Sequence, residues 1–332
     1  MKKFEDLTIN IIYVKGSVNA LLPLFDSLLK NSQCQFQIIS NACTQDELRS
    51  LNAYCQRNSE RVKLLDLMVT TIMPHHEVIN VLLENETSDW FCFMDSDCLA
   101  TGDFLGEWLF GMDESQALFT GFPIWYDYEN FKVIPHNYKV LFGEYCESHN
   151  GVKFGITYCA CYRTTILKQV MKEFGITFQR YLWQNIPRSI QNQLMSAELR
   201  KEFYDTGKLI NILMVLGGAK FKVNESHSLI HLGGISQLAE KRISVFGSLY
   251  VYTRFKVPKF VIGAVKMIRR LISGYLITHN EAIQLVNFER RKLAAEQFIF
   301  TNNFSQGLKI FSQQEIHRMK VTKEKILKIY NG

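Results

Sequence analysis

The stretch WFCFMDSDC, residues 90–98, decides how this chain can fold. Its first five residues are bulky and largely apolar, which predicts a buried β-strand. Asp95 and Asp97 follow at once, and an unpaired carboxylate inside a buried strand would be very costly. We therefore expect both carboxylates at the carboxyl end of this strand, where open α/β sheets bind their ligands.

Two carboxylates one position apart can share a hard cation. Ions such as Mg²⁺ commonly take one or two carboxylates together with the phosphate oxygens of a bound molecule. The alternative is a strand-end turn in which Asp95 and Asp97 only cap the next segment. The motif alone does not decide between a metal site and a turn, but its place behind a hydrophobic strand makes it more specific.

The residues before this strand alternate between strand and helix patterns. Strands are predicted at residues 7–14, 36–40 and 62–67, and helices at 19–30, 47–58 and 78–84. Thr44 and Asp46 are both candidates for the N-cap of the second helix. Such alternation is typical of a parallel sheet covered by helices, so the predicted fold class is α/β.

Composition places the chain among folded proteins with free thiols. Its 332 residues suggest one large or two fused domains, and a hydrophobic content of 47% excludes global disorder. The eight cysteines are scattered without a CxxC pair, which favours a reduced, cytosolic chain. The apolar run at residues 9–14 is too short for a secretory signal, and no apolar stretch is long enough to span a bilayer.

Charge is distributed unevenly along the chain. Residues 240–332 hold 17 Lys and Arg against six Glu and no Asp, a formal charge of +11, whereas residues 1–239 carry −5. This split suggests that the basic part meets an anionic surface. Residues 254–276 have the pattern of a basic amphipathic helix, which suits an anionic membrane surface or, equally, a helix that covers the core.

The region after residue 116 is less regular. Residues 117–123 read as another strand, and residues 164–174 as a helix that ends at Gly175. Between them, aromatic residues crowd a polar segment at residues 125–138. Such a segment suits a sugar-binding surface, but most of its rings are expected to pin a long loop to the core.

Four segments together resemble a GT-A-fold glycosyltransferase, in the family 2-like group of nucleotide-sugar enzymes. They are the first strand and its helix ending in LFDSLL, then IISNACTQDEL (38–48), HHEVINVLL (75–83) and WFCFMDSDCLATGDF (90–104). The resemblance covers residues 7–236 and is most specific at the Asp-x-Asp segment. It implies a donor-binding half at 1–115, an acceptor-binding half at 116–239 and a basic, mainly helical extension at 240–332.

The resemblance also implies a set of donor contacts. Asp95 and Asp97 would hold Mn²⁺ or Mg²⁺, which would bridge the diphosphate of a nucleotide diphosphate sugar. The residues expected to contact the nucleotide sugar are Val14, Asn41, Asp66, Asp95 and Ser96. The family often has an acid near position 41, so Asn41 leaves the nature of that contact open. Asp66 could equally be a surface loop acid.

Two further residues receive roles from the resemblance. Asp205 precedes an amphipathic helix, where inverting members place the general base that deprotonates the acceptor hydroxyl. The alternative is a helix N-cap, and Glu198 and Glu202 are the fallback candidates. His231, followed by Leu-Gly-Gly, matches a late metal-ligating histidine, although a lone histidine is more often structural.

The function predicted from the sequence is therefore metal-dependent transfer of a sugar from a nucleotide diphosphate sugar to a glycan or lipid-linked glycan, with inversion. A nucleotidyltransferase on a similar fold and a non-catalytic sugar- or nucleic-acid-binding protein are the alternatives. Nucleic acid is not expected as a partner, because the tail lacks a recognisable nucleic-acid motif. The expected location is the cytoplasm, with peripheral attachment of the tail to the inner face of the membrane.

Overall fold

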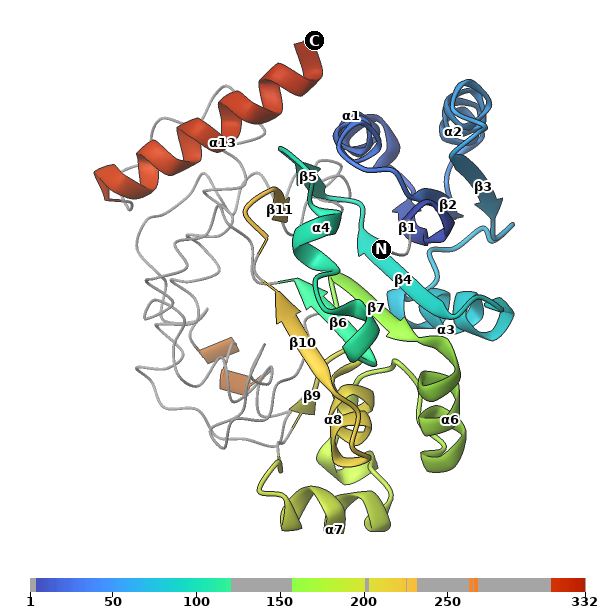
Figure 1. The fold of residues 1–332 in the computed structure, drawn as a ribbon, viewed down its shortest axis with the longest axis vertical. Coiled ribbons are helices and arrows are strands. Elements are labelled where there is room, and N and C mark those ends of the chain that lie inside the picture. The colour runs from blue at the N-terminus through green and yellow to red at the C-terminus, as the bar shows by residue number, and fades with distance from the viewer. Residues whose placement is uncertain are drawn as a thin grey trace.

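A seven-stranded sheet forms the centre of the protein (Figure 1). The computed structural model describes residues 4–120, 157–200, 203–224, 226–231, 263–264, 266–267 and 312–331. The strand order is β10-β6-β7-β4-β1-β2-β3. These strands are β1 (Thr8–Val14), β2 (Gln35–Asn41), β3 (Val62–Asp66), β4 (Trp90–Asp95), β6 (Ala117–Thr120), β7 (Cys159–Arg163) and β10 (Phe221–Asn224).

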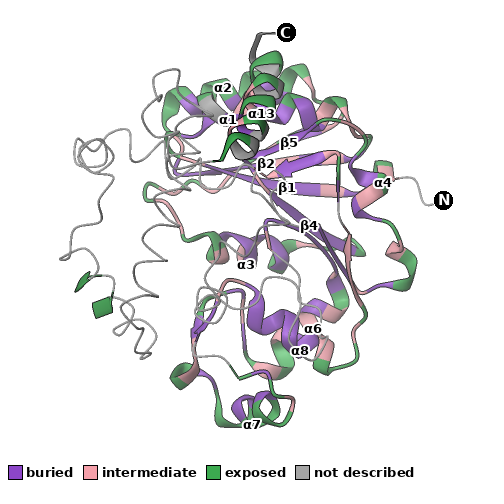
Figure 2. Ribbon diagram, turned by 90° about the vertical axis from the view of Figure 1, so that its left-hand side faces the viewer, coloured by how far each residue is buried: buried purple, intermediate pink, exposed green. Residues whose placement is uncertain are grey.

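Helices cover both faces of this sheet. The α-helices are α1 (Val18–Lys30), α2 (Gln45–Arg57), α3 (His75–Asn85), α4 (Leu105–Trp108), α6 (Thr164–Phe174), α7 (Arg188–Ser196), α8 (Lys208–Leu216) and α13 (Gln313–Asn331). Figure 2 shows α1, α2 and α13 on one side of the strands and α3, α6 and α8 on the other. Within the described residues, no helix is both long and apolar enough to cross a membrane.

Short elements complete the structure. Two small sheets pair β5 (Cys98–Ala100) with β11 (Leu229–His231), and β8 (Tyr181–Leu182) with β9 (Phe203–Tyr204). The 3₁₀ turns are Phe4–Asp6, Met112–Glu114 and Trp183–Asn185.

The buried strand β4 shows why the sequence folds this way. Side chains alternate across a strand, so Trp90, Cys92 and Met94 pack into the core that contains α1 and α2. Phe91 and Phe93 pack into the opposite core with α3, α6 and α8. Fully burying a large apolar side chain stabilises the fold by about 1.5–3 kcal/mol relative to exposure. A strand apolar on both faces is therefore held between two helical layers.

The predicted α/β class with a mostly parallel sheet is confirmed. Strands β1 to β4 pair in parallel, as their alternation with helices indicates. Strand β7, however, lies antiparallel between β4 and β6. Strands β6, β7 and β10 belong to the same sheet as β1 to β4. The division into halves at residues 1–115 and 116–239 and an extension at 240–332 stays a prediction.

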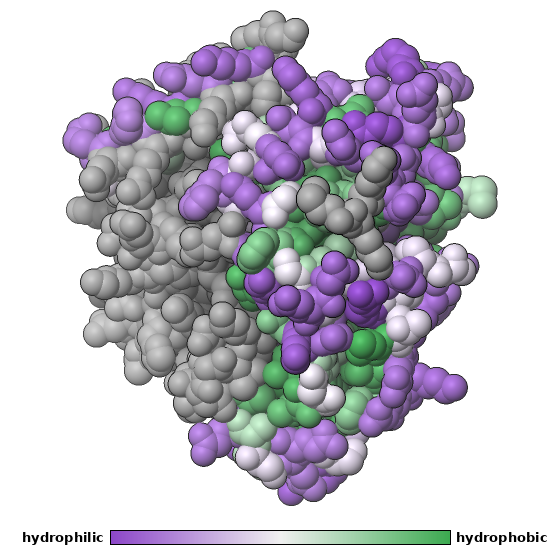
Figure 3. Space-filling view, in the orientation of Figure 1, coloured by the Kyte–Doolittle hydropathy of each residue, from purple (hydrophilic) through white to green (hydrophobic). Residues whose placement is uncertain are grey.

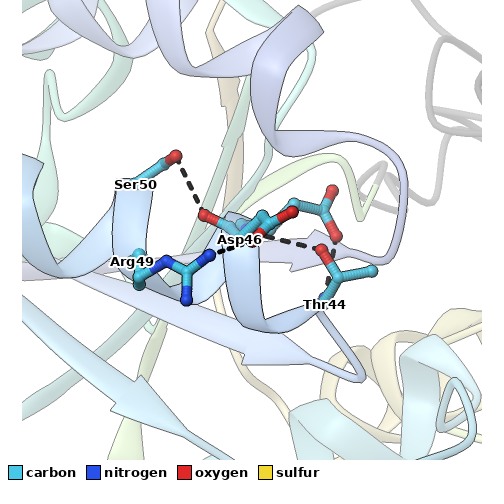
Figure 4. A network of polar contacts seen from close by, with 5 residues as sticks. Thr44, Asp46, Arg49 and Ser50 are labelled. Atoms are coloured by element: carbon cyan, nitrogen blue, oxygen red, sulfur yellow. Dashed lines mark hydrogen bonds and ion pairs between the residues drawn. The ribbon is translucent and has the colours of Figure 1, made fainter.

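Local sequence signals place most helix ends. Of the two N-cap candidates of α2, Thr44 is the cap, and it forms a reciprocal capping box with Glu47. Figure 4 shows Thr44, Asp46, Arg49 and Ser50 at this first turn, where the Arg49 guanidinium pairs with the Asp46 carboxylate. Helix α6 has the predicted bounds and ends at Gly175, whose φ of 63° is left-handed. Helix α3 begins three residues earlier than predicted, because Pro74 provides its N-cap.

The seven cysteines among the described residues are all free, as their spacing predicts. Cys92 and Cys161 lie opposite each other on β4 and β7. Burial raises the pKa of the Cys34 thiol to about 11, although Ser32 and Arg61 act in the opposite direction. The Cys34 thiol is therefore protonated and serves as a small apolar core residue.

Little of the basic tail falls within the described residues. Helix α13 packs on α1 through Ile316 and Met319, and its outward side is mainly hydrophilic in Figure 3. The predicted helix at 254–276 lies outside the described residues except for 263–264 and 266–267, which are helical. The aromatic segment at 125–138 and the residues 121–123 of the predicted strand also lie outside them.

Candidate metal centre

Backbone pairing brings three potential metal ligands together. Strand β4 ends at Asp95, a turn holds Ser96 and Asp97, and β5 follows at Cys98. Strand β11 pairs antiparallel with β5, and this register sets His231 opposite Cys98. A histidine that is distant in sequence thus lies beside the two aspartates.

The side chains of these residues converge as ligands of one ion would. Their carboxylate oxygens and imidazole nitrogen all lie within 4.8 Å of one another. His231 Nε2 is 3.1 Å from Asp97 Oδ1 and 3.4 Å from Asp95 Oδ2. For octahedral coordination with bonds of about 2.1 Å, neighbouring ligand atoms lie about 3.0 Å apart. The spacing of the three side chains therefore fits a common divalent cation.

Burial gives the cluster an inner and an outer side. The side chains of Asp97 and His231 are 6% and 13% exposed, whereas that of Asp95 is 33% exposed. Neither nitrogen of His231 makes a hydrogen bond, although both are buried. Nε2 nevertheless lies within ion-pair distance of Asp97 and Asp95, so the two carboxylates share one positive charge, which either a ring proton or a bound cation can supply. The donor set therefore fits a divalent ion on Nε2.

The two carboxylates of the cluster also account for the pKa of His231. Burial alone would lower the pKa of this imidazole, but the carboxylates of Asp97 and Asp95 outweigh it and raise the pKa to about 9. Without a metal ion, the imidazolium would supply the positive charge that the two carboxylates need. A bound cation would take over that role from the proton.

Tyr158 and His75, which the sequence did not identify as site residues, contact members of the cluster. The ring of Tyr158 stacks on that of His231, with centroids 4.2 Å apart and planes 4° from parallel. The Tyr158 carbonyl also accepts the backbone N–H of Asp95 at 2.7 Å. His75, in the first turn of α3, places Nε2 3.6 Å from Asp95 Oδ1. The His75-His76 pair before a helix is visible in the sequence, but the contact with Asp95 depends on packing.

The residues predicted to contact the donor lie along one edge of the sheet. Val14 pairs with Asn41 in the register of β1 and β2, Ser40 with Asp66 in β2 and β3, and Ile12 with Asp95 in β1 and β4. We call this the carboxyl edge, because all four parallel strands end there. Ser96 is buried in the turn after β4.

Two of these donor-contact candidates already have partners. The Asn41 amide donates to the Met73 carbonyl and accepts from the Met73 N–H, both at 2.8 Å. It thus anchors the loop that leads into α3. Asp66 Oδ1 accepts the N–H of Met68 at 3.2 Å. The contacts of Val14, Asn41, Asp66, Asp95 and Ser96 with a nucleotide sugar remain predictions.

Asp205 lies in a separate polar pair. Helix α8 begins at Lys208 with Gly207 as its N-cap, so Asp205 is not the cap. Gly207 has a φ of 71°, and a Cβ there would come within 2.7 Å of the Thr157 side chain, so only glycine fits. Asp205 Oδ1 accepts from Arg180 Nε at 2.9 Å, and its side chain is 37% exposed.

Arg180, the partner of Asp205, acts on the first turn of α3 through its charge. The positive charge of Arg180 contributes to the lowered pKa of His76, after burial as the larger cause. The neighbouring His75 in turn contacts Asp95. Of the fallback candidates, Glu198 follows α7 with a φ of 58°, and Glu202 lies outside the described residues.

Solved structures similar to this chain include glycosyltransferases. S. aureus TarS (residues 1–349) is 13% identical over 97% of this chain and 80% of that one, with a TM-score of 0.42. The mannosyltransferase PcManGT from Pyrobaculum calidifontis, solved with GDP-Man and Mn²⁺, is 9% identical over 97% and 85%, with a TM-score of 0.38. The glycosyltransferase GlyE of Streptococcus pneumoniae is 13% identical over 86% and 64%, with a TM-score of 0.35.

Neither a family model nor a curated protein sequence matches the chain. All three TM-scores are below 0.5, and we therefore base the proposals below on the side chains of this chain.

Proposed function

We propose that this protein is a metal-dependent glycosyltransferase that moves a sugar from a nucleotide diphosphate sugar to a glycan or lipid-linked glycan. One observation carries the proposal: Asp95, Asp97 and His231 converge at the carboxyl edge, with both nitrogens of His231 buried and without a hydrogen bond. In an open α/β sheet this edge is where ligands bind. A metal ion held there would face an anionic substrate.

The three ligands have different tasks in this proposal. Asp97 and His231, whose side chains are the less exposed, would hold the ion, and the more exposed Asp95 would be the ligand accessible to the donor. When bound, the ion supplies Lewis-acid stabilisation of the charge that develops on the leaving nucleoside diphosphate. An imidazole in the donor set favours Mn²⁺ over Mg²⁺, which prefers oxygen ligands.

The donor contacts follow from the order of the strands. Val14, Asn41 and Asp66 end three neighbouring strands beside Asp95 and Ser96, so they would line the nucleotide side of the site. Asn41 would act by shaping the loop at Met73, since its amide is already bonded there. Asp66 would contact the nucleotide through its second carboxylate oxygen.

Asp205 acts as general base in this mechanism. Its carboxylate takes the proton of the acceptor hydroxyl while that oxygen attacks the anomeric carbon and the bond to the diphosphate breaks. A single displacement of this kind inverts the anomeric centre. Arg180 holds one carboxylate oxygen of Asp205 at 2.9 Å and leaves the other for the acceptor. The proposed membrane contact of a lipid-linked acceptor, through 254–276, rests on sequence alone.

A thermal-shift screen with nucleotides tests this function. A ligand that binds only the native state raises the melting temperature by mass action. Nucleoside diphosphates and their sugars should do so in the presence of Mn²⁺ and not in its absence. Nucleoside triphosphates serve as the comparison, because stabilisation by triphosphates alone would favour a nucleotidyltransferase. No shift with any nucleotide in Mn²⁺ would contradict the proposal.

A further inference from the structure

A carboxylate outside the metal centre accepts hydrogen bonds from the segment that leads into β11. Glu107, in helix α4, accepts the Ser226 hydroxyl at 2.6 Å, the Ser228 N–H at 3.0 Å and the Ser228 hydroxyl at 3.3 Å. One residue later, at Leu229, β11 begins, and it ends at His231. Glu107 thus fixes the backbone immediately before the strand that carries a metal ligand.

We propose that Glu107 is a positioning residue for the metal centre, which acts by holding the 226–228 turn and thereby setting His231 against Asp95 and Asp97. This inference rests on the proposed metal site. Glu107 itself touches neither the ion nor its ligands, so its influence passes through the backbone of β11.

Because β11 is short, the hydrogen bonds to Glu107 are important for fixing its position. The strand has three residues, and in the described residues it pairs with β5 alone. A three-residue antiparallel ladder gives few hydrogen bonds to fix the position of its last residue. The backbone N–H of Thr101 adds one more bond, to the Ser228 carbonyl at 2.8 Å. Glu107 supplies three bonds from a charged acceptor, and such bonds are roughly twice as strong as neutral ones.

Residues around α4 hold the preceding strand as well. The Asn224 amide, at the end of β10, donates to the carbonyls of Trp108 and Phe110 at 2.6 and 3.0 Å. The segment between β10 and β11 is therefore attached to α4 and its flank at both ends. A metal site needs its ligands within about 0.5 Å of the required geometry. Loosening one attachment point next to β11 would widen the range of His231 positions beyond that limit.

The charge state of Glu107 agrees with this role. Burial acts to raise the pKa of its carboxyl, but the hydrogen bonds from Ser226 and Ser228 outweigh burial and lower it. The carboxylate therefore stays ionised at neutral pH and keeps accepting from the turn.

Mn²⁺ titration calorimetry on the full chain without nucleotide tests the proposal. We expect Glu107→Gln to weaken Mn²⁺ binding by about 10- to 100-fold, the range typical for a residue that orients a metal ligand. Ser226→Ala, a milder change, should weaken it less. The double variant should lose less than the product of the two single losses, because both act through one contact.

The matched control is Glu47→Gln. Glu47 is another carboxylate that accepts backbone N–H groups, from Gly16 at 2.8 Å and Thr44 at 2.9 Å, but it lies at the start of α2. This variant should lower the melting temperature and leave Mn²⁺ affinity within about twofold. Equal losses of Mn²⁺ affinity in Glu47→Gln and Glu107→Gln would show general destabilisation and overturn the proposal.

Two further outcomes separate this inference from the proposed function. Wild-type affinity in folded Glu107→Gln would overturn the role of Glu107 and leave the metal site standing. Failure of the wild-type chain itself to bind Mn²⁺ would overturn both.

Discussion

The metal centre and the Asp205–Arg180 pair differ in how fully their polar groups are satisfied. His231 is buried, and neither of its nitrogens makes a hydrogen bond. Asp205 is more than a third exposed and already bonded to Arg180 and to the N–H of Thr206. The first site gathers two carboxylates around one imidazole, whereas the second pairs one carboxylate with one guanidinium.

This difference indicates how each site would be used. The side chains of Asp95, Asp97 and His231 lie at distances that suit the ligands of one ion. A half-exposed carboxylate held on one side by arginine is suited to meet a substrate that comes and goes. The comparison predicts that changes at the cluster alter metal binding, and that changes at Asp205 alter turnover alone.

The largest expected effect comes from Asp97→Asn. The substitution keeps the shape of the side chain but removes the charge of the most buried ligand. Mn²⁺ affinity should fall by more than about 100-fold, beyond the range for residues that only support a ligand. Sugar transfer should become undetectable. Calorimetry and a radiolabelled-donor assay measure the two effects, with the exposed Asp113→Asn as control. Retained Mn²⁺ affinity in Asp97→Asn would remove the cluster from the mechanism.

A smaller effect, confined to turnover, is expected from Asp205→Asn. Loss of a general base lowers kcat by about 10²- to 10⁴-fold. Mn²⁺ and donor affinities should stay at wild-type values, because Asp205 touches neither ligand in the proposed mechanism. Steady-state kinetics with saturating Mn²⁺ measures this split. Arg180→Gln should cost much less, since an exposed ion pair contributes only about 0–1 kcal/mol. A kcat of Asp205→Asn within about threefold of wild type would reassign the base.

The smallest expected effect is a pH dependence of metal affinity. The raised pKa of His231, about 9, means that Mn²⁺ must displace a proton at neutral pH. Affinity should therefore increase by about tenfold per pH unit up to about pH 8.5. In the metal-free protein the protonated imidazole stabilises the fold fully below its ordinary pKa of 6.5, and this contribution is lost as pH rises through about 9.

Calorimetry at several pH values measures this slope. His231→Gln should remove it, whereas His317→Gln, on the exposed side of α13, should leave it unchanged. A slope near zero in the wild-type chain would mean that His231 is not a ligand.

The sequence predicted the parts of the structure that depend on local patterns. Short, largely apolar runs identified β1 to β4, Gly175 correctly placed the end of α6, and Thr44 was one of two candidates for the cap of α2. The carboxylates of Asp95 and Asp97 were placed at a strand end because a buried strand cannot hold them. The pairing of His231 with these residues followed from a resemblance, and the register of β5 and β11 supplies its physical basis.

The remainder depends on contacts between distant segments. Nothing local in Cys159–Arg163 indicates that β7 runs antiparallel between β4 and β6. Glu107 reaches a turn about 120 positions away, and Arg180, just before β8, pairs with Asp205, just after β9. Tyr158 stacks on His231 only because two strands place the rings together. No local sequence pattern identifies these residues, because their roles depend on contacts with segments that are distant in the sequence.

The most direct test of the metal centre is an anomalous difference map from crystals grown with Mn²⁺ and a nucleoside diphosphate. We expect one strong Mn²⁺ peak about 2.1–2.3 Å from ligand atoms of Asp95, Asp97 and His231. A map in which Mn²⁺ is present elsewhere, or bound to the nucleotide alone, with no peak among these three side chains would contradict it.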